Sequence, residues 1–321
     1  PNIIFLQDVG MIAVGKTKKE SQIAIDIAEQ NISVIKDIEK TSKFKSISKK
    51  ALFDMEYWSL EQAKLNKVKK ELQGKVVAIT GGLGKIGFET YKLFKDKGAE
   101  VVILDVNRKL IHEFRKQYDD LCIECDVSNK SSVSKSFSKI ISELGGLDIL
   151  VSNAGYAPQG MIAEISDNEL RKSFDNNFFA HQNCASIATK IFIDQNIKGC
   201  LLFNISKQAV NPGKSFGPYG LPKAALMNLC KQYAIDYGSF GVRSNGVNAD
   251  RIMSGLLDAK MINERSRARG LTSKEYMQGN LLKSEVFATD VAKAFFHLAV
   301  SEKTTGTILT VDGGNIAASF R

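Results

Sequence analysis

A serine, a tyrosine and a lysine at fixed spacing are the residues of this sequence best suited to chemistry. Ser206 precedes Tyr219 by thirteen residues, and Lys223 follows Tyr219 by four. Side chains four positions apart share one face of a helix, so the phenol and the ammonium are expected to lie together. A neighbouring cation favours the phenolate, and a tyrosine that normally titrates near pH ~10 then acts as a base closer to neutrality. The spacing therefore predicts a general base on a helix.

Apolar and amphipathic segments alternate around these three residues. Ser206 closes the apolar run 200–206 and so stands at the carboxyl end of an expected strand. Ligands bind at such strand ends in doubly wound sheets. Buried strands that alternate with amphipathic helices indicate a parallel sheet covered on both faces. We therefore predict an α/β fold over residues 74–321, a doubly wound Rossmann-type parallel sheet flanked by helices.

The hydrophobic periodicity places the elements of this sheet and of its helical layers. Strands are expected at 75–80, 100–105, 121–125, 148–155, 200–205, 242–247 and 307–311, and helices at 86–97, 109–118, 131–144, 167–192, 218–237 and 289–300.

Residues 1–73 have a different pattern and are expected to form a small, mainly helical N-terminal segment. A short strand is expected at 3–6, followed by helices at 18–36 and 48–72. One strand and two helices cannot close a core alone. This segment is therefore expected to pack on the main domain, on a second copy of the chain or on a further part of the protein.

Composition excludes several classes of partner. A hydrophobic content of 44% and a charged content of 25% are typical of a soluble globular protein. The net charge of +9 comes from lysines that alternate with acidic residues and accompany no nucleic-acid motif, so we expect no nucleic-acid partner. No apolar run is long enough to span a bilayer and no signal peptide is evident, so no membrane partner is expected. Five cysteines, an odd number, favour a reducing compartment and a cytoplasmic location.

A glycine-rich segment precedes the first long helix of the predicted sheet. Residues 80–87 read Thr-Gly-Gly-Leu-Gly-Lys-Ile-Gly, directly after a strand and at the start of a helix. Glycines let the backbone approach a pyrophosphate, and the helix N-terminus supplies oriented N–H groups. The segment therefore predicts a dinucleotide site at this strand end.

One carboxylate indicates which dinucleotide binds. Asp105 ends the second strand, eighteen residues after Gly87. A carboxylate there accepts hydrogen bonds from the ribose hydroxyls of NAD and repels the 2′-phosphate of NADP. NAD is the predicted cofactor. Lys85 and Arg108 are within reach of a 2′-phosphate, so NADP stays open as an alternative.

With these residues in view, the chain resembles the short-chain dehydrogenase/reductase family over residues 74–321. The matching segments are 80–87, 126–127, 152–155, 175–179 and 310–314, together with the serine, tyrosine and lysine. The resemblance implies a catalytic tetrad of Asn177, Ser206, Tyr219 and Lys223, a small-molecule substrate and a homo-oligomer, either a dimer or a tetramer. The cofactor contacts that it implies are Gly81, Gly84, Lys85, Ile86, Gly87, Asp105, Asp126, Val127, Asn153, Ala154, Gly155, Tyr219, Lys223, Ile252 and Ser254.

The same resemblance implies a role for each residue of the tetrad. Tyr219 takes the proton of a substrate hydroxyl during oxidation, while Ser206 forms a hydrogen bond with the substrate oxygen. Lys223 lowers the pKa of Tyr219 and binds the nicotinamide ribose. Asn177 holds a water molecule that links Lys223 to solvent.

Two departures from the family pattern leave alternatives open. The glycine spacing resembles the extended, epimerase-type branch, so a nucleotide-sugar epimerase is one alternative. The chain ends soon after Asp312, without the larger substrate domain expected of such an enzyme. The second departure is that Ala249 and Asp250 replace the family's Pro-Gly pair, so the cofactor loop is expected to change shape.

A non-catalytic cofactor-binding module is a further alternative function, and the complete tetrad argues against it.

A second resemblance covers both ends of the chain. Segments 10–16, 53–65 and 312–318 are similar to fusions of a class II aldolase with a short-chain dehydrogenase, of the rhamnulose phosphate aldolase/lactaldehyde dehydrogenase type. Residues 1–73 are then the last piece of the aldolase half. The aldolase's metal-binding histidines are absent, because the only histidines are His112, His181 and His297. We expect no metal site and no aldolase activity in this chain.

Arginine is unevenly distributed and suggests a substrate site. Nine residues are arginine, and four of these fall between 251 and 269. Guanidinium groups bind carboxylate or phosphate with two parallel hydrogen bonds, which lysine does not. A substrate lid is predicted between 250 and 284, with an anionic substrate such as a sugar acid or sugar phosphate. A solvated helix or intersubunit salt bridges are the alternative. The four candidates are Arg251, Arg265, Arg267 and Arg269.

Overall fold

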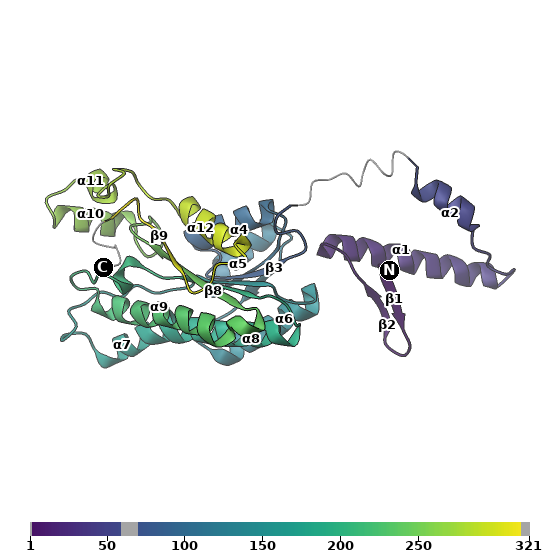
Figure 1. The fold of residues 1–321 in the computed structure, drawn as a ribbon, viewed down its shortest axis with the longest axis horizontal. Coiled ribbons are helices and arrows are strands. Elements are labelled where there is room, and N and C mark those ends of the chain that lie inside the picture. Colours follow the sequence, from purple (N-terminus) through teal and green to yellow (C-terminus); the bar gives the residue numbers. More distant parts are fainter. Residues whose placement is uncertain (1, 59–69, 316–321) are drawn as a thin grey trace. The chain divides into compact units, whose positions relative to one another are not determined.

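The computed structural model describes residues 2–58 and 70–315 and divides into two units, Pro1–Gly74 and Lys75–Arg321. The larger unit contains a seven-stranded sheet in the order β5-β4-β3-β6-β7-β8-β9, with every neighbouring pair parallel (Figure 1). The predicted doubly wound parallel sheet is confirmed. Its strands are β3 (Val76–Thr80), β4 (Glu100–Asp105), β5 (Cys122–Glu124), β6 (Ile149–Ser152), β7 (Cys200–Asn204), β8 (Arg243–Ala249) and β9 (Ile308–Val311).

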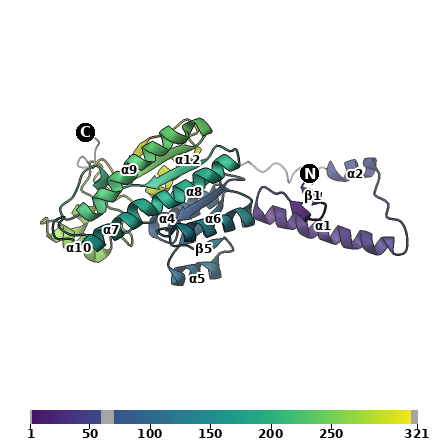
Figure 2. The same ribbon diagram turned by 90° about the horizontal axis from the view of Figure 1, so that it is seen from below.

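Helices cover both faces of this sheet, which is why its central strands are apolar along their length. Figures 1 and 2 show one layer with α4 (Lys85–Asp96), α5 (Arg108–Gln117) and α12 (Ala288–Val300). The opposite layer contains α6 (Lys130–Leu144), α8 (Ala180–Asp194) and α9 (Gly217–Tyr237). A large core cluster lies under the second layer, with Phe137, Phe192, Phe203 and Leu226 at or below 1% exposure. These side chains hold α9, the helix that carries Tyr219 and Lys223, against the sheet.

The strand order places a ligand crevice at the carboxyl ends of the central strands. The chain builds β3, β4 and β5 outward in one direction, and then returns so that β6 lies beside β3. The carboxyl ends of β3 and β6 therefore flank the point where the strand order reverses. Dinucleotides bind at this point in open parallel sheets.

The single helix predicted over 167–192 is wrong in one respect. The structure has α7 (Asp167–Phe174), a π-helical turn (Asp175–Phe179) and then α8. Single π turns inside α-helices often occur at functional sites. Asn177 lies in this turn and is buried, so the irregular backbone belongs to the candidate site.

The segment between β8 and α12 forms a small subdomain of its own. It contains α10 (Ala259–Arg267) and α11 (Ser273–Met277). Apolar side chains pack together beneath these two helices, which gives the segment a second, smaller core. They are Leu257, Ile262, Tyr276 and Met277, with Met261 at the edge. The predicted lid region is therefore an ordered structure with helices of its own.

The N-terminal unit contains a β-hairpin that the sequence did not reveal. β1 (Ile3–Leu6) pairs antiparallel with β2 (Gly10–Ala13), although only the first strand was predicted. Helix α1 (Lys18–Glu39) follows, and its N-cap Thr17 accepts a hydrogen bond from the Glu20 amide at 3.1 Å. The predicted helix 48–72 is confirmed over α2 (Lys49–Glu56) and is wrong at residues 57–58 and 70–72, which are not helical. Residues 59–69 lie outside the described ranges.

Within the described ranges, no helix combines the length and the apolar character needed to cross a bilayer.

Candidate functional site

The glycine-rich loop after β3 is built for close backbone approach. Gly81 has φ +58°, and a Cβ there would lie 2.9 Å from the Cα of Ala154. A Cβ on Gly87 would overlap the carbonyl oxygen of Gly81, so α4 can start this close to the loop only with glycine. The N-terminus of α4 therefore faces the crevice between β3 and β6, with its oriented N–H groups available to a phosphate.

Thr80 and Asn153 fasten this loop to the neighbouring strand ends. Thr80 Oγ1 accepts hydrogen bonds from the amides of Asn153 and Ala154, at 2.9 and 3.1 Å. The Asn153 side-chain amide donates to the carbonyls of Thr80 and Gly81, both at 3.1 Å. Its oxygen accepts from the Asn204 side chain at 2.8 Å. The carboxyl ends of β3, β6 and β7 are thus joined by side chains, which fixes the shape of the crevice.

Asp105 lies at the carboxyl end of β4, beside the glycine loop. Its carboxylate accepts hydrogen bonds from the amides of Leu83 and Asn107, both at 3.0 Å. This places a negative charge where the ribose of a bound dinucleotide would lie. Arg108, the candidate for a 2′-phosphate, forms an exposed ion pair with Glu124 at 2.8 Å.

The crevice brings together most of the residues that were predicted to bind a cofactor. Among the predicted residues that do not line the crevice itself, Gly87 packs against the backbone of Gly81 and Gly82, and Ile252 lines the adjoining cavity. Asn107, Leu110 and Asn176 also line the crevice and were not predicted, because no local motif marks them. The predicted residues that line the crevice are Gly81, Gly84, Lys85, Ile86, Asp105, Asp126, Val127, Asn153, Ala154, Gly155 and Ser254.

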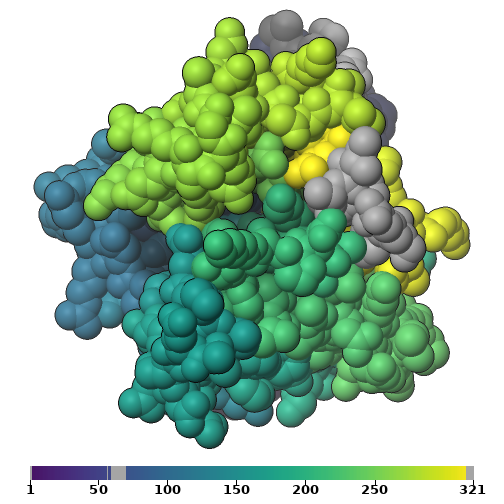
Figure 3. Space-filling view, turned by 90° about the vertical axis from the view of Figure 1, so that its left-hand side faces the viewer, coloured from purple at the N-terminus to yellow at the C-terminus, as the bar shows by residue number. Residues whose placement is uncertain are grey.

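A second cavity adjoins the crevice and contains Ser206 and Tyr219. Ser206 follows β7 and caps a short 3₁₀ turn, where its hydroxyl accepts a hydrogen bond from the Gln208 amide at 3.3 Å. Tyr219 lies in the first turn of α9. Figure 3 looks onto this face, where the yellow-green segment that contains α10 and α11 overhangs a hollow. The cavity is therefore enclosed from above by the small subdomain.

Burial dominates the proton affinity of Tyr219. Desolvation raises the pKa of Tyr219 to about 12, and its hydrogen bond with Ser206 acts in the opposite direction. The i, i+4 spacing predicted a lowered pKa instead. The Lys223 Nζ lies 5.8 Å from the centre of the Tyr219 ring, and it donates to the Asn204 carbonyl at 2.9 Å. In the protein alone, desolvation of the phenol therefore outweighs the effect of its hydrogen bond with Ser206.

Lys223 is the most deeply buried charged group of the site. It is 2% exposed, and burial lowers its pKa to about 7. Gly155 leaves room beside it, because a Cβ there would lie 3.8 Å from Lys223 Nζ and 3.3 Å from Asn177 Oδ1. The structure thus brings Lys223 and Asn177 to the same point, although 46 positions separate 177 from 223.

The side chain of Asn177 is held by three hydrogen bonds. Its oxygen accepts from the Tyr156 amide at 3.0 Å, and its Nδ2 donates to the Tyr156 carbonyl at 2.6 Å. The same nitrogen donates to Ser173 Oγ at 3.1 Å. The π turn and the segment after β6 are thereby locked together beside Lys223.

Three of the four candidate arginines line the second cavity. Arg251 donates to the Tyr276 carbonyl at 2.6 Å and lies 3.5 Å from Asp250. Arg265 stacks on the Phe216 ring at 4.6 Å, and Arg269 approaches the Tyr276 ring at 5.5 Å. Arg267 is exposed on α10 and is outside the set of cavity-lining residues.

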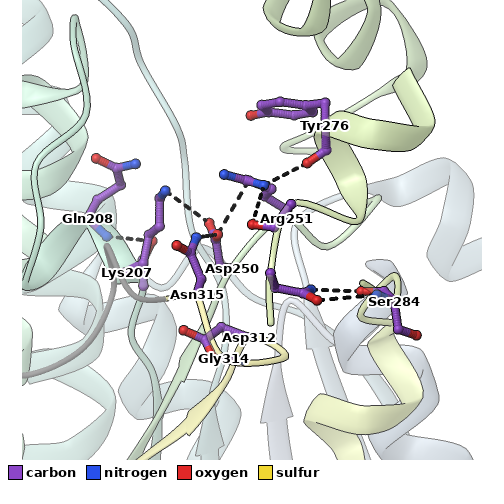
Figure 4. Close-up of polar contacts among 12 residues, drawn as sticks. Lys207, Gln208, Asp250, Arg251, Tyr276, Ser284, Asp312, Gly314 and Asn315 are labelled. Atoms are coloured by element: carbon purple, nitrogen blue, oxygen red, sulfur yellow. Dashed lines mark hydrogen bonds and ion pairs between the residues drawn. The ribbon is translucent and has the colours of Figure 1, made fainter. Parts of the chain in front are cut away.

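The buried carboxylate of Asp250 organises the base of this cavity (Figure 4). It lies 3.6 Å from Lys207 Nζ and 3.5 Å from Arg251 Nε, and it accepts a hydrogen bond from the Asn315 side chain. Arg251 adopts φ +51°, which lets the chain turn sharply after β8. The Ala249-Asp250 pair therefore gives the loop a charged anchor. Sequence reasoning missed Lys207, although its position directly after Ser206 was a signal.

The fold and this site define a nicotinamide-dependent oxidoreductase of the Rossmann class, and comparison with known proteins gives the family. The family model described as "Enoyl-(Acyl carrier protein) reductase" matches residues 83–315. The chain belongs to the short-chain dehydrogenase/reductase family. Residues 1–65 match the model described as "Aldolase class II, second domain", so the resemblance to aldolase fusions is also confirmed.

Named relatives agree with this assignment. The chain is 30% identical over 338 residues to "Uncharacterized oxidoreductase YuxG" of Bacillus subtilis, across 100% of this chain and 49% of the relative. The chain thus spans about half the length of that relative. It is 34% identical to "Short chain aldehyde dehydrogenase 1" of Euphorbia lathyris, over 76% of this chain and 89% of the relative.

A solved structure agrees as well. Aldohexose dehydrogenase of Thermoplasma acidophilum superposes with a TM-score of 0.66 at 27% identity, over 75% of this chain and 93% of that protein.

Gly87→Ala tests whether the glycine-rich loop after β3 binds the dinucleotide. The added Cβ meets backbone of the loop itself, so the loop must move, and we expect dinucleotide affinity to fall at least ~10-fold. Intrinsic fluorescence titration with NADH measures this. Gly238→Ala is the matched control, because a Cβ at Gly238 meets nothing within 4 Å. Equal affinity in both variants would contradict the assigned role of the loop.

Lys223→Met tests the buried ammonium through the pH dependence of stability. The pKa of Lys223 falls from 10.5 to about 7 on folding, so the unfolded chain binds more protons between these values. The contribution of Lys223 to stability is therefore complete above pH ~10.5 and is lost as pH falls to about 7.

Urea unfolding at pH 7, 8 and 9 measures this contribution. The free energy of unfolding of the wild type should rise with pH relative to that of Lys223→Met. Lys231→Met, which removes an exposed lysine from the same helix, should keep the wild-type dependence. Parallel curves for wild type and Lys223→Met would show that Lys223 is not titrating in this range.

Proposed function

We propose that this chain catalyses reversible hydride transfer between a nicotinamide cofactor and a small alcohol or carbonyl compound. One observation carries the proposal. The glycine-lined crevice and the cavity that holds Ser206 and Tyr219 share four lining residues, Ile86, Asn204, Ser254 and Leu256. A dinucleotide that lies along the crevice would therefore end beside the phenol, where a substrate in the second cavity meets it.

The residues of the site suit this reaction. A bound nicotinamide would supply the hydride acceptor. Tyr219 takes the proton of the substrate hydroxyl as the carbinol carbon gives up its hydride. Ser206 forms a hydrogen bond with the substrate oxygen as it becomes a carbonyl. Lys223 supports the Tyr219 phenolate with its positive charge, and Asn177 holds the π turn beside Lys223. General-base catalysis of this kind contributes on the order of 10²–10⁴ in rate.

We propose NAD as the preferred cofactor. Asp105 lines the crevice at the end of β4, the position from which a carboxylate accepts hydrogen bonds from the ribose of NAD, and Arg108 is paired with Glu124. Asp105 would repel the 2′-phosphate of NADP at this position. Arg108 would not offset this repulsion while it is paired with Glu124. Comparison of NADH and NADPH in the same titration tests this preference.

We propose that the substrate is a small anionic compound, such as a sugar acid or sugar phosphate. Of the described residues that line the second cavity, four are cationic and one is acidic. Arg265 Nη2 is buried and has no hydrogen-bond partner in the described part of the chain. A buried guanidinium nitrogen without a partner is costly, and a bound carboxylate or phosphate oxygen would satisfy it. The charged lining residues are Lys207, Asp250, Arg251, Arg265 and Arg269.

We propose that residues 1–73 are the last part of an aldolase-like domain joined to a dehydrogenase domain at 74–321. The aldolase family match at residues 1–65 supports this division, as does the structural boundary after Gly74. The N-terminal unit buries few side chains of its own, and Ala28 is the buried residue of α1. Such a unit depends on further contacts for stability.

Tyr219→Phe tests the proposed reaction. Loss of the phenolic oxygen removes the proton acceptor and leaves the crevice intact, so kcat should fall on the order of 10²–10⁴ while NADH affinity stays within about 2-fold. The assay follows nicotinamide absorbance with a panel of polyols, aldehydes and sugar acids. Turnover near that of the wild type would exclude Tyr219 as the base, and an epimerase would convert substrate without net NADH formation.

Arg265→Leu tests the substrate class. A hydrogen-bonded ion pair is lost, so KM for an acidic substrate should rise about 10- to 100-fold, while KM for a neutral analogue of equal length changes little. Arg267→Leu is the matched control, because Arg267 is exposed on the same helix. Equal changes for acidic and neutral substrates in Arg265→Leu would refute an anionic substrate.

A further inference from the structure

A buried chain of polar side chains lies behind the catalytic lysine. Ser152 Oγ is 2.7 Å from His181 Nδ1, and His181 Nε2 is 3.5 Å from Lys223 Nζ. Each of the three residues is at most 2% exposed. They come from β6, α8 and α9, so three separate elements place them in line. Neither Ser152 nor His181 takes part in the proposed reaction.

The groups that stabilise the protonated form of Lys223 are all neutral. On α9 its titratable neighbour is Tyr219, one turn earlier. On α8 the buried titratable groups are His181 and, one turn further, Cys184, while Lys190 and Asp194 of the same helix are exposed. Asn177 and Asn204, from the π turn and β7, are uncharged. Over the described residues, no carboxylate forms an ion pair with Lys223. Its positive charge is therefore supported by the Asn204 carbonyl and by the imidazole.

The tautomer of His181 follows from these contacts. Burial holds the pKa of His181 well below its usual value, and the nearby Lys223 lowers it further, so the ring is neutral and carries one proton. An ammonium is only a donor, so Nε2 must be the acceptor and the proton lies on Nδ1. Nδ1 then donates to Ser152 Oγ. With the proton on Nε2, two donors would face each other.

We propose that His181, with its tautomer held by Ser152, is a positioning residue that keeps Lys223 charged and aimed at the catalytic tyrosine. His181 acts through Lys223 and contacts neither the expected substrate position nor the cofactor crevice. The consequence for turnover rests on the proposed function, whereas the effect on Lys223 does not. Without the Nε2 acceptor, the buried ammonium loses its proton more readily, and Tyr219 loses the charge that supports its phenolate.

The test is a direct titration of Lys223 in the whole chain without cofactor. The ¹³Cε resonance of labelled lysine, assigned with Lys223→Met, reports the midpoint. His181→Leu should lower this midpoint by about one pKa unit or more, because a hydrogen bond to a charged group is lost. His181→Gln should restore most of it, because its Oε1 can accept from the ammonium. Cys184→Ala controls for a cavity in the same helix.

Ser152→Ala provides a second, independent variant. Loss of the Ser152 acceptor frees Nδ1, shifts the proton to Nε2 and should lower the Lys223 midpoint in the same direction. Both variants should also reduce kcat at pH 7 with little change in substrate KM. An unchanged or raised midpoint in whichever of the two variants folds would overturn the proposal, as would a lowered midpoint with unchanged kcat. Failure of the hydride-transfer proposal would leave the titration result intact.

Discussion

Burial of an ammonium beside a phenol is the constraint on which the rest of this structure depends. The packing of α9 against β7 and α8 buries Lys223 and leaves Tyr219 half-buried at the cavity wall. Desolvation lowers the pKa of Lys223 and raises that of Tyr219. Both shifts favour the uncharged forms. A charged pair is needed for proton transfer, so the surrounding elements must supply dipoles that oppose desolvation. The Asn204 carbonyl, Ser206 and His181 are the groups placed to do so.

The carboxyl ends of the central strands connect this buried pair to its two cavities. Asn153 joins the glycine loop to Asn204, and the Asn204 carbonyl in turn accepts from Lys223. Asp250 plays the corresponding part for the second cavity, because Lys207, Arg251 and the Asn315 side chain all contact its carboxylate. Polar side chains at strand ends thus hold both the glycine loop, through Thr80 and Asn153, and the second cavity, through Asp250.

Much of the fold was predictable because its signals are local. Continuous apolar runs such as 76–80 and 100–105 predicted the buried parallel strands, and observed boundaries differ by few residues. The π turn at Asp175–Phe179 was missed because its period departs from 3.6 over only five residues, inside a helix that otherwise keeps its pattern. The strand β2 was missed because its four residues, Gly-Met-Ile-Ala, do not alternate apolar and polar types, although exposed and half-buried positions alternate along the strand.

The sequence by itself determined the parallel sheet, the glycine-rich loop and the spacing of Ser206, Tyr219 and Lys223. Each of these features depends on residues that are close together in the sequence. The tertiary structure alone decided the protonation of the site, since desolvation depends on which elements pack around a side chain. It also decided that Arg265 faces the cavity while Arg267, two residues away on α10, faces solvent. His181 became visible only when β6, α8 and α9 brought Ser152, the imidazole and Lys223 into one line.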